Sequence, residues 1–200
     1  MVPVRRRADS CTPESSEVSV QFHHHVPQPS PQRMVPIPGS PLVVGVVPGQ
    51  SELVTATAAA WADALGGVPL HFAYVDATRI VDEEYPDGSV RHSSLDPDLA
   101  DDSWTTVEDE LRAHLTMLLA DHAAPWDFRF LAGRPDRALT HLARAVGASA
   151  FVVGARRPSS TERVREFLAG SVALHLTRHQ HRPVLVVPVA VVDWKAPAPW

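Results

Sequence analysis

Residues 127–154, DFRFLAGRPDRALTHLARAVGASAFVVG, place two short apolar segments on either side of a stretch with helical spacing. The segments Asp127–Leu131 and Phe151–Gly154 have the length and composition of buried strands. The stretch between them carries apolar residues on one helix face: Ala138, Leu139, Leu142 and Val146. A strand, a helix and a second strand in this order predict a βαβ unit with parallel strands.

The same alternation continues outward in both directions. Further strands are expected over Leu42–Val47, Pro69–Asp76 and Val184–Val189. Further helices are expected where one face would be formed by Leu53, Thr57, Ala60, Trp61 and Ala64, by Val107, Leu111, Leu115 and Leu118, and by Leu168, Val172, Ala173 and Leu176. Five strands separated by four helices predict an α/β fold, with a five-stranded parallel sheet and helices on both faces. The valine-rich strands agree, because strands covered on both faces need no polar alternation.

The remaining segments divide the 200 residues into three parts. Residues 1–40 are rich in proline and have little apolar periodicity, so we expect a disordered arm. Residues 41–190 form the expected domain, and residues 191–200 a C-terminal tail. Inside the domain, residues 77–103 carry many Asp and Glu, which favours a solvated acidic loop or flap over a calcium site with regular ligand spacing.

Composition excludes several classes of protein. A formal charge of -5 argues against a nucleic-acid binder, and the single Cys11 excludes an internal disulfide framework. The apolar stretches are too short to span a membrane, and the N-terminus lacks the apolar segment of a secretory signal, so a cytoplasmic protein is expected. Arg5–Arg7 and His23–His25 are interpreted as solvated parts of the arm.

A ligand site is expected beyond the carboxyl ends of the strands, where the strand order reverses. If Leu42–Val47 and Phe151–Gly154 are neighbours, the loop after residue 47 faces the loop of residues 154–171. The second loop carries Arg156 and Arg157 and ends at a helix N-terminus, where backbone N–H groups and the helix dipole favour an anion. A phosphate-sized ligand fits these features. Glycines kept for tight packing and solvated arginines remain the alternative.

Signs of catalysis are weak. Ser171 lacks a G-x-S-x-G turn, and Cys11 has no basic helix terminus beside it, so we expect no catalytic residue. A hydrolase would need a carboxylate, which only the acidic loop could bring by folding over the pocket.

Histidines on the closing helix have the spacing of metal ligands. His175 and His179 are one turn apart and His181 is close, but no carboxylate lies at a matching helical offset, which favours surface histidines over a metal site. Asp136 is explained as an acid at a helix N-terminus.

Four segments carry a family resemblance: VVGVVPGQSE (43–52), LHFAYVD (70–76), LAGRPDRALTHLARAVGASAFVVGAR (131–156) and LAGSVALHLTRHQHRPVLVVP (168–188). In this order they resemble the universal stress protein domain over about residues 42–190. The resemblance implies a Rossmann-like, adenine nucleotide alpha hydrolase-like sheet, a homodimer and, in one branch, bound ATP.

That branch carries G-x2-G-x9-G-[ST] after the fourth strand. Gly154 matches the first glycine, and Gly170 and Ser171 match the closing pair, with Val172 following. The middle glycine is replaced by Arg157, and the spacing is three residues longer than in the family.

The family's aspartate after the first strand aligns with Pro48, which lacks a backbone donor and a side-chain acceptor. Gly49 keeps the turn, and Val75 matches the position whose backbone meets adenine. The resemblance therefore implies a cytoplasmic, non-enzymatic stress-response module with a degenerate or altered ATP loop. Mg²⁺ is expected only if ATP binds. Two copies are expected to pair through Val184–Val189, and other protein partners are unknown. The alternatives are a nucleotide-independent interaction module and, with less support, a nucleotide hydrolase.

Overall fold

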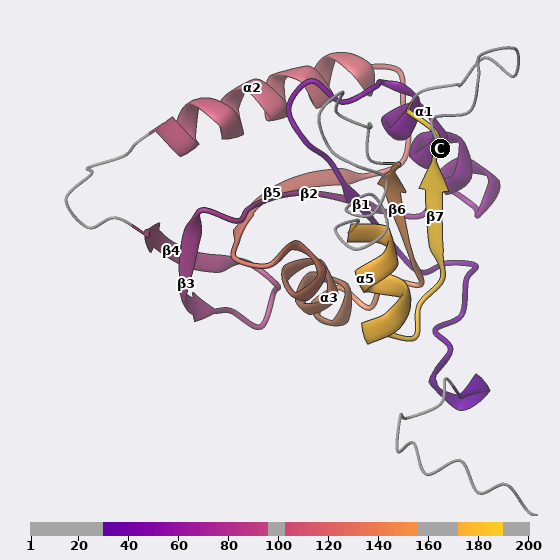
Figure 1. Cartoon of the computed structure of the whole chain (residues 1–200). Coiled ribbons are helices and arrows are strands. Elements are labelled where there is room, and N and C mark those ends of the chain that lie inside the picture. Colours follow the sequence, from indigo (N-terminus) through magenta and orange to yellow (C-terminus); the bar gives the residue numbers. More distant parts are fainter. Residues whose placement is uncertain (1–29, 96–102, 156–171, 190–200) are drawn as a thin grey trace, which may run out of the picture.

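The computed structural model describes residues 30–95, 103–155 and 172–189. Five parallel strands form one sheet in the order β5-β2-β1-β6-β7. Their bounds are β1 (Leu42–Gly45), β2 (Leu70–Asp76), β5 (Trp126–Ala132), β6 (Ala150–Gly154) and β7 (Val184–Val187). The predicted five-stranded parallel sheet is confirmed (Figure 1).

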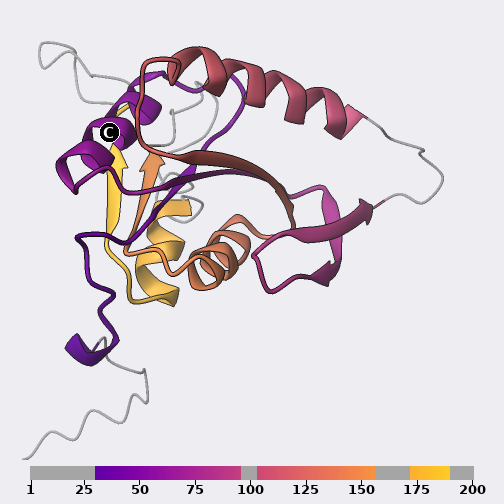
Figure 2. The ribbon, with the colours of Figure 1, turned by 180° about the vertical axis from the view of Figure 1, so that it is seen from behind.

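Helices cover both faces of this sheet, as predicted (Figures 1 and 2). They are α1 (Leu53–Ala64), α2 (Ser103–Leu118), α3 (Pro135–Ala145) and α5 (Val172–His179), and a short 3-10 helix, η1 (Pro31–Arg33), precedes β1. Neighbouring residues of a strand enter different layers: Val44 packs in the α1–α2 core, whereas Val43 packs in the α3–α5 core. This alternation explains the continuous valine runs of β1 and β6, because both faces of these central strands are buried.

The predicted buried face of α1 is wrong. Val54, Ala58 and Ala62 are fully buried against the sheet, whereas Leu53 and Trp61 are 50% and 46% exposed. The small residues lie at i, i+4 and i+8 and let the helix approach the strands closely. The prediction relied on the large side chains of Leu53 and Trp61, which lie outside this buried face.

The acidic segment after β2 is not a loop throughout, which corrects the prediction for residues 77–103. It forms a separate antiparallel hairpin of β3 (Arg79–Glu84) and β4 (Val90–Ser94). Asp87 and Gly88 lie in its turn, where Gly88 has φ +85° and the Asp87 carboxylate accepts hydrogen bonds from Ser89 N and Oγ at 3.0 and 2.6 Å. Most of the acids lie at exposed positions, so a charged stretch still forms a strand pair.

The hairpin packs on the sheet and on α3. Arg79 is only 8% exposed; its Nε donates to His92 Nδ1 at 2.9 Å, and its guanidinium lies 5.6 Å from the centre of the Trp104 ring. At the other end, Arg129 of β5 donates to the Asp87 carbonyl at 2.9 Å. Arg79 thereby joins the hairpin to α2, and the hairpin turn is bonded to the edge strand β5.

Several predictions concern residues outside the described ranges. These are most of the arm, the tail 191–200, Cys11, Arg5–Arg7, His23–His25, Leu168 and the last part of the acidic segment. Among the described residues, no helix is both long enough and apolar enough to cross a membrane.

Candidate functional site

The strand order reverses between β1 and β6. From β1 the chain first builds outward through β2 to β5, then returns to the other side of β1 with β6 and continues to β7. Loops leaving two such strands diverge and leave a crevice at the carboxyl edge, where α/β proteins bind ligands. The predicted neighbours β1 and β6 pair directly, with Gly45 opposite Val153.

The turn after β1 is closed by its own polar groups. Gln50 N donates to Val47 O at 3.2 Å, and Gly49 has φ +67°, a conformation that favours glycine. Pro48 precedes it, as in a type II turn. The side chain of Gln50 turns back, and its Oε1 accepts a hydrogen bond from Val47 N at 2.9 Å.

Gly154 lies against this turn. A Cβ at residue 154 would stand 2.5 Å from Gln50 Nε2, 3.0 Å from Val189 Cγ1 and 3.2 Å from Val54 Cγ2. Any side chain at 154 would therefore displace the Gln50 amide. Glycine at the end of β6 allows a carboxamide to lie across the point where β1 and β6 diverge.

The structure brings only some of the predicted site residues to this point. Pro48 and Gly49 lie exposed in the turn. Gly154 lies against the side chain of Gln50, which belongs to the same turn. Val75 near the end of β2 and Val172 at the start of α5 both pack against the α3–α5 core. The other predicted residues, Arg156, Arg157, Gly170 and Ser171, lie outside the described residues.

Sequence reasoning missed Gln50. Its amide can both donate and accept hydrogen bonds, and it occupies the turn where the aligned Pro48 can do neither with its side chain. The sequence does place a polar residue two positions after Pro48, in the turn that follows the first strand, and this position could have been considered as a candidate contact. Its contact with Gly154, however, joins segments about a hundred residues apart.

The carboxyl end of β2 contributes an acid that is already engaged. Asp76 Oδ1 accepts hydrogen bonds from Thr78 N and Oγ1 at 2.8 and 2.7 Å, and Asp76 O accepts from Gly133 N at 3.0 Å. Burial, with a smaller contribution from the Asp76 charge, raises the pKa of Tyr74. Asp76 thus fixes the connection into β3 and ties β2 to the loop after β5.

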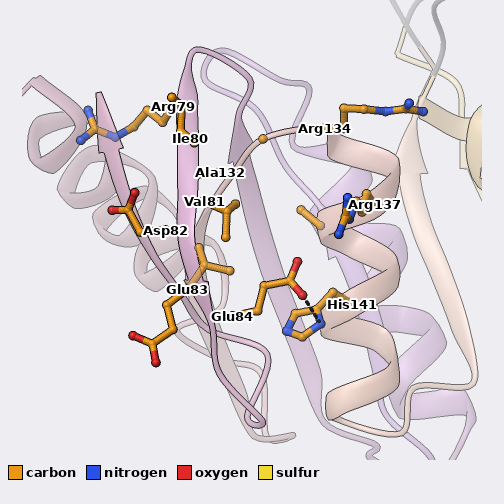
Figure 3. Close-up of a pocket in the computed structure, with 13 residues that line it drawn as sticks. Arg79, Ile80, Val81, Asp82, Glu83, Glu84, Ala132, Arg134, Arg137 and His141 are labelled. Carbon is orange, nitrogen blue, oxygen red and sulfur yellow. Dashed lines mark ion pairs between the residues drawn. The ribbon is translucent and has the colours of Figure 1, made fainter. Parts of the chain in front are cut away.

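A cleft of about 520 Å³ lies between the hairpin and α3 (Figure 3). Val81 points into it, and Glu84 and His141 face each other across it with 3.6 Å between Oε2 and Nδ1. His141 Nε2 also lies 3.3 Å from the Tyr85 carbonyl. These contacts join the hairpin to α3, and the cleft was not predicted because the hairpin was expected to be a loop.

The histidines of α5 lie beside Asp136 at the start of α3. His179 Nδ1 is 3.8 Å from Asp136 Oδ2, whereas His181 lies with Arg33, 3.1 Å from its Nη1. Arg134 donates to both Asp136 oxygens, at 3.2 and 2.9 Å. Burial raises the pKa of Asp136, but the Arg134 hydrogen bonds and charge outweigh it, and the pKa lies below its usual value.

Comparison with protein families finds one match over most of the chain. The model of the Universal stress protein family matches residues 40–188. None of the curated proteins matches the sequence.

Solved structures share this fold. A universal stress protein from Archaeoglobus fulgidus is 22% identical, with a TM-score of 0.54, and the match covers 74% of this chain and 98% of that chain. The universal stress protein from Archaeoglobus fulgidus in complex with dAMP is 20% identical over 77% of this chain and 99% of that chain, with a TM-score of 0.50. A universal stress protein in complex with cAMP is 22% identical over 76% of this chain and 99% of that chain, with a TM-score of 0.52.

Proposed function

The chain belongs to the universal stress protein family, and on that premise we propose that it binds an adenine nucleotide where β1 and β6 diverge and acts as a nucleotide-responsive stress-signalling module. The single observation that carries this proposal is the Gln50–Gly154 contact, which places a carboxamide at the reversal of strand order. Two structures with the same fold are complexes with dAMP and cAMP, which supports the choice of an adenine nucleotide.

The proposed binding mode is altered from the family's ATP motif. Pro48 offers no hydrogen bond in place of the family's aspartate, so the Gln50 amide takes over that polar contact. Arg157 stands where the family has its middle glycine, and Arg156 precedes it. Their guanidinium groups would bind phosphate with charged, forked hydrogen bonds instead of backbone donors. ATP, with Mg²⁺ on its phosphates, is the proposed ligand.

Isothermal titration of the full chain with ATP and Mg²⁺, and separately with AMP and cAMP, tests this proposal. We expect micromolar binding in the wild-type chain and an affinity about fivefold lower in Gln50→Ala, since one good hydrogen bond is worth on the order of 1 kcal/mol. Gly154→Ala moves the same amide and should weaken binding as well. Gln32→Ala, an exposed glutamine of η1, is the matched control.

Arg157→Gly separates two outcomes of that titration. Weaker ATP binding by Arg157→Gly would support a phosphate contact. Binding by Arg157→Gly but not by the wild-type chain would overturn the proposal, because Arg157 would then close the pocket. If neither the wild-type chain nor Arg157→Gly binds ATP, the proposal is also overturned, and a nucleotide-independent interaction module is favoured.

We propose that this site binds without turnover. Among the described residues, the side chains beside Gly154 are the Gln50 amide and the apolar groups of Val54 and Val189, and none of these supplies a general base. The acids of β3 belong to a hairpin that packs on α3, where Glu84 pairs with His141. Phosphate release from ATP should stay at the level of a protein-free control, and release that falls in Glu84→Gln would contradict this.

We also propose that two copies pair through β7. Among the described residues β7 is bonded to β6 alone, and Val186 is 44% exposed on it. An open strand edge of this kind can bond to a second copy. Light scattering after gel filtration should give a dimer mass for the wild-type chain and a monomer mass for Val186→Lys. A monomer mass for the wild-type chain would contradict the proposal.

A further inference from the structure

Three side chains that can bind a metal ion meet where α3 begins beside α5. One carboxylate oxygen of Asp136 and one ring nitrogen each of His175 and His179 lie within 4.8 Å of one another. The two histidine rings are nearly parallel, at 12°, with centres 5.9 Å apart. The one-turn spacing of His175 and His179 could be seen in the sequence. The Asp136 oxygen could not, because it is brought to them by the packing of α3 against α5.

Hydrogen bonds orient Asp136 and His179 in this cluster. Asp136 has a side chain only 10% exposed, and Arg134 donates to both of its oxygens. His179 Nδ1 donates to the His175 carbonyl at 2.8 Å and lies 3.8 Å from Asp136 Oδ2, so Nε2 carries the lone pair and the ring has to turn to bring Nε2 to the cluster. Metal-binding histidines and carboxylates in proteins are commonly oriented by hydrogen bonds of this kind.

The chemistry of the three ligands selects the ion. Two imidazoles and one carboxylate suit zinc and similar transition metals, whereas calcium and magnesium prefer oxygen ligands alone. Zinc bonds of about 2.0–2.2 Å in a tetrahedral site put ligand atoms roughly 3.4 Å apart. The ligand atoms must therefore come closer by up to about 1.4 Å, and His179, whose side chain is 56% exposed, has room to rotate.

We propose that Asp136, His175 and His179 bind a divalent zinc-type ion, with water in the fourth position. The ion joins the first turn of α3 to α5, two helices far apart in the sequence. The site is separate from the Gln50 turn and does not depend on nucleotide binding. Because α5 begins at Val172, directly after the Gly170–Ser171 pair, bound metal also steadies the helix that follows this loop.

Competition with a chromophoric zinc chelator measures the affinity in the full chain. His23, His24 and His25 are first changed to asparagine, because three adjacent histidines in the arm can bind metal weakly. We expect one equivalent of Zn²⁺ to remain bound in this background. His179→Gln and Asp136→Asn should each weaken binding tenfold or more, while His181→Gln, whose ring lies with Arg33 and not in the cluster, should leave it unchanged.

Two further readouts guard against a variant that simply unfolds. Co²⁺ should give the intense visible absorption of a tetrahedral site, and His179→Gln, an exposed change, should abolish it while the circular dichroism stays the same. Zn²⁺ should raise the Tm of the background chain and not that of His179→Gln, since only a ligand bound to the folded state stabilises it. Equal zinc affinity in all variants, or no zinc bound once His23–His25 are changed, overturns the proposal.

Discussion

The central strands of the sheet lie between two apolar layers, whereas the β3–β4 hairpin has one face on the protein and the other in solvent. Phe151 of β6 is fully buried in the core between the sheet and the α3–α5 layer. The hairpin is attached through Arg79 on Trp104 and through its glycine turn on α3. The sheet therefore depends on buried volume, and the hairpin on backbone fit and on the charge state of a few side chains.

The largest effect should come from the sheet. Phe151→Ala should cost about 3–5 kcal/mol in the free energy of unfolding, because it removes a large buried side chain and leaves a cavity. Tyr85→Ala in the hairpin removes another aromatic ring, but one that is 36% exposed, and should cost well under half as much. Urea unfolding measures both, and equal losses would contradict the contrast between sheet and hairpin.

A smaller effect is expected where the hairpin turn meets α3. A Cβ on Gly88 would stand 2.8 Å from Leu142 Cδ1 and 3.0 Å from Ala145 Cβ, at φ +85°. Gly88→Ala should cost about 1–3 kcal/mol and speed hydrogen exchange in β3 and β4. The control is Gly66→Ala, which has φ +96° and no atom within 4 Å, so it reports the backbone strain alone. If Gly66→Ala costs as much as Gly88→Ala, the turn does not pack tightly on α3.

The smallest effect should be a dependence on pH. Burial, followed by the Arg79 charge, lowers the pKa of His92. The unfolded chain therefore binds the proton first, so this contribution to stability is complete above about pH 6.5 and is lost as the pH falls through the folded-state pKa. His92→Gln keeps an acceptor for Arg79 and cannot titrate, so its stability should fall less between about pH 7 and 5. The same slope in His92→Gln as in the wild-type chain would exclude His92 as the cause, and His181→Gln is the control.

The parallel sheet could be predicted because valine runs and helical periodicity report burial directly. The valine-rich runs predicted strands over Leu42–Val47 and Val184–Val189, and the structure forms strands at Leu42–Gly45 and Val184–Val187. The face of α1 was missed because Trp61 suggests a core more strongly than Ala58 and Ala62 do, although the small residues allow the closer approach. A large apolar side chain favours burial, but a small one allows the helix to lie closer to the sheet, and in α1 the small residues are the buried ones.

The hairpin and the candidate sites depend on contacts between distant segments. The acids of β3 resemble a solvated loop, and the Asp87–Gly88 turn signal was outweighed by their charge. Gln50 meets Gly154, and Asp136 meets His179, only after the sheet has formed. A sequence can therefore show the residue types of such sites but not which ones become neighbours.

The central position of β1 also has a consequence during synthesis. Its partner β6 follows roughly a hundred residues later, which at about 5–20 residues per second is a wait of several seconds. Throughout that time Leu42, Val43 and Val44 have been made but lack one of the two strands beside which they are buried. The emerging chain is consequently a candidate client for chaperones until β6 leaves the ribosome.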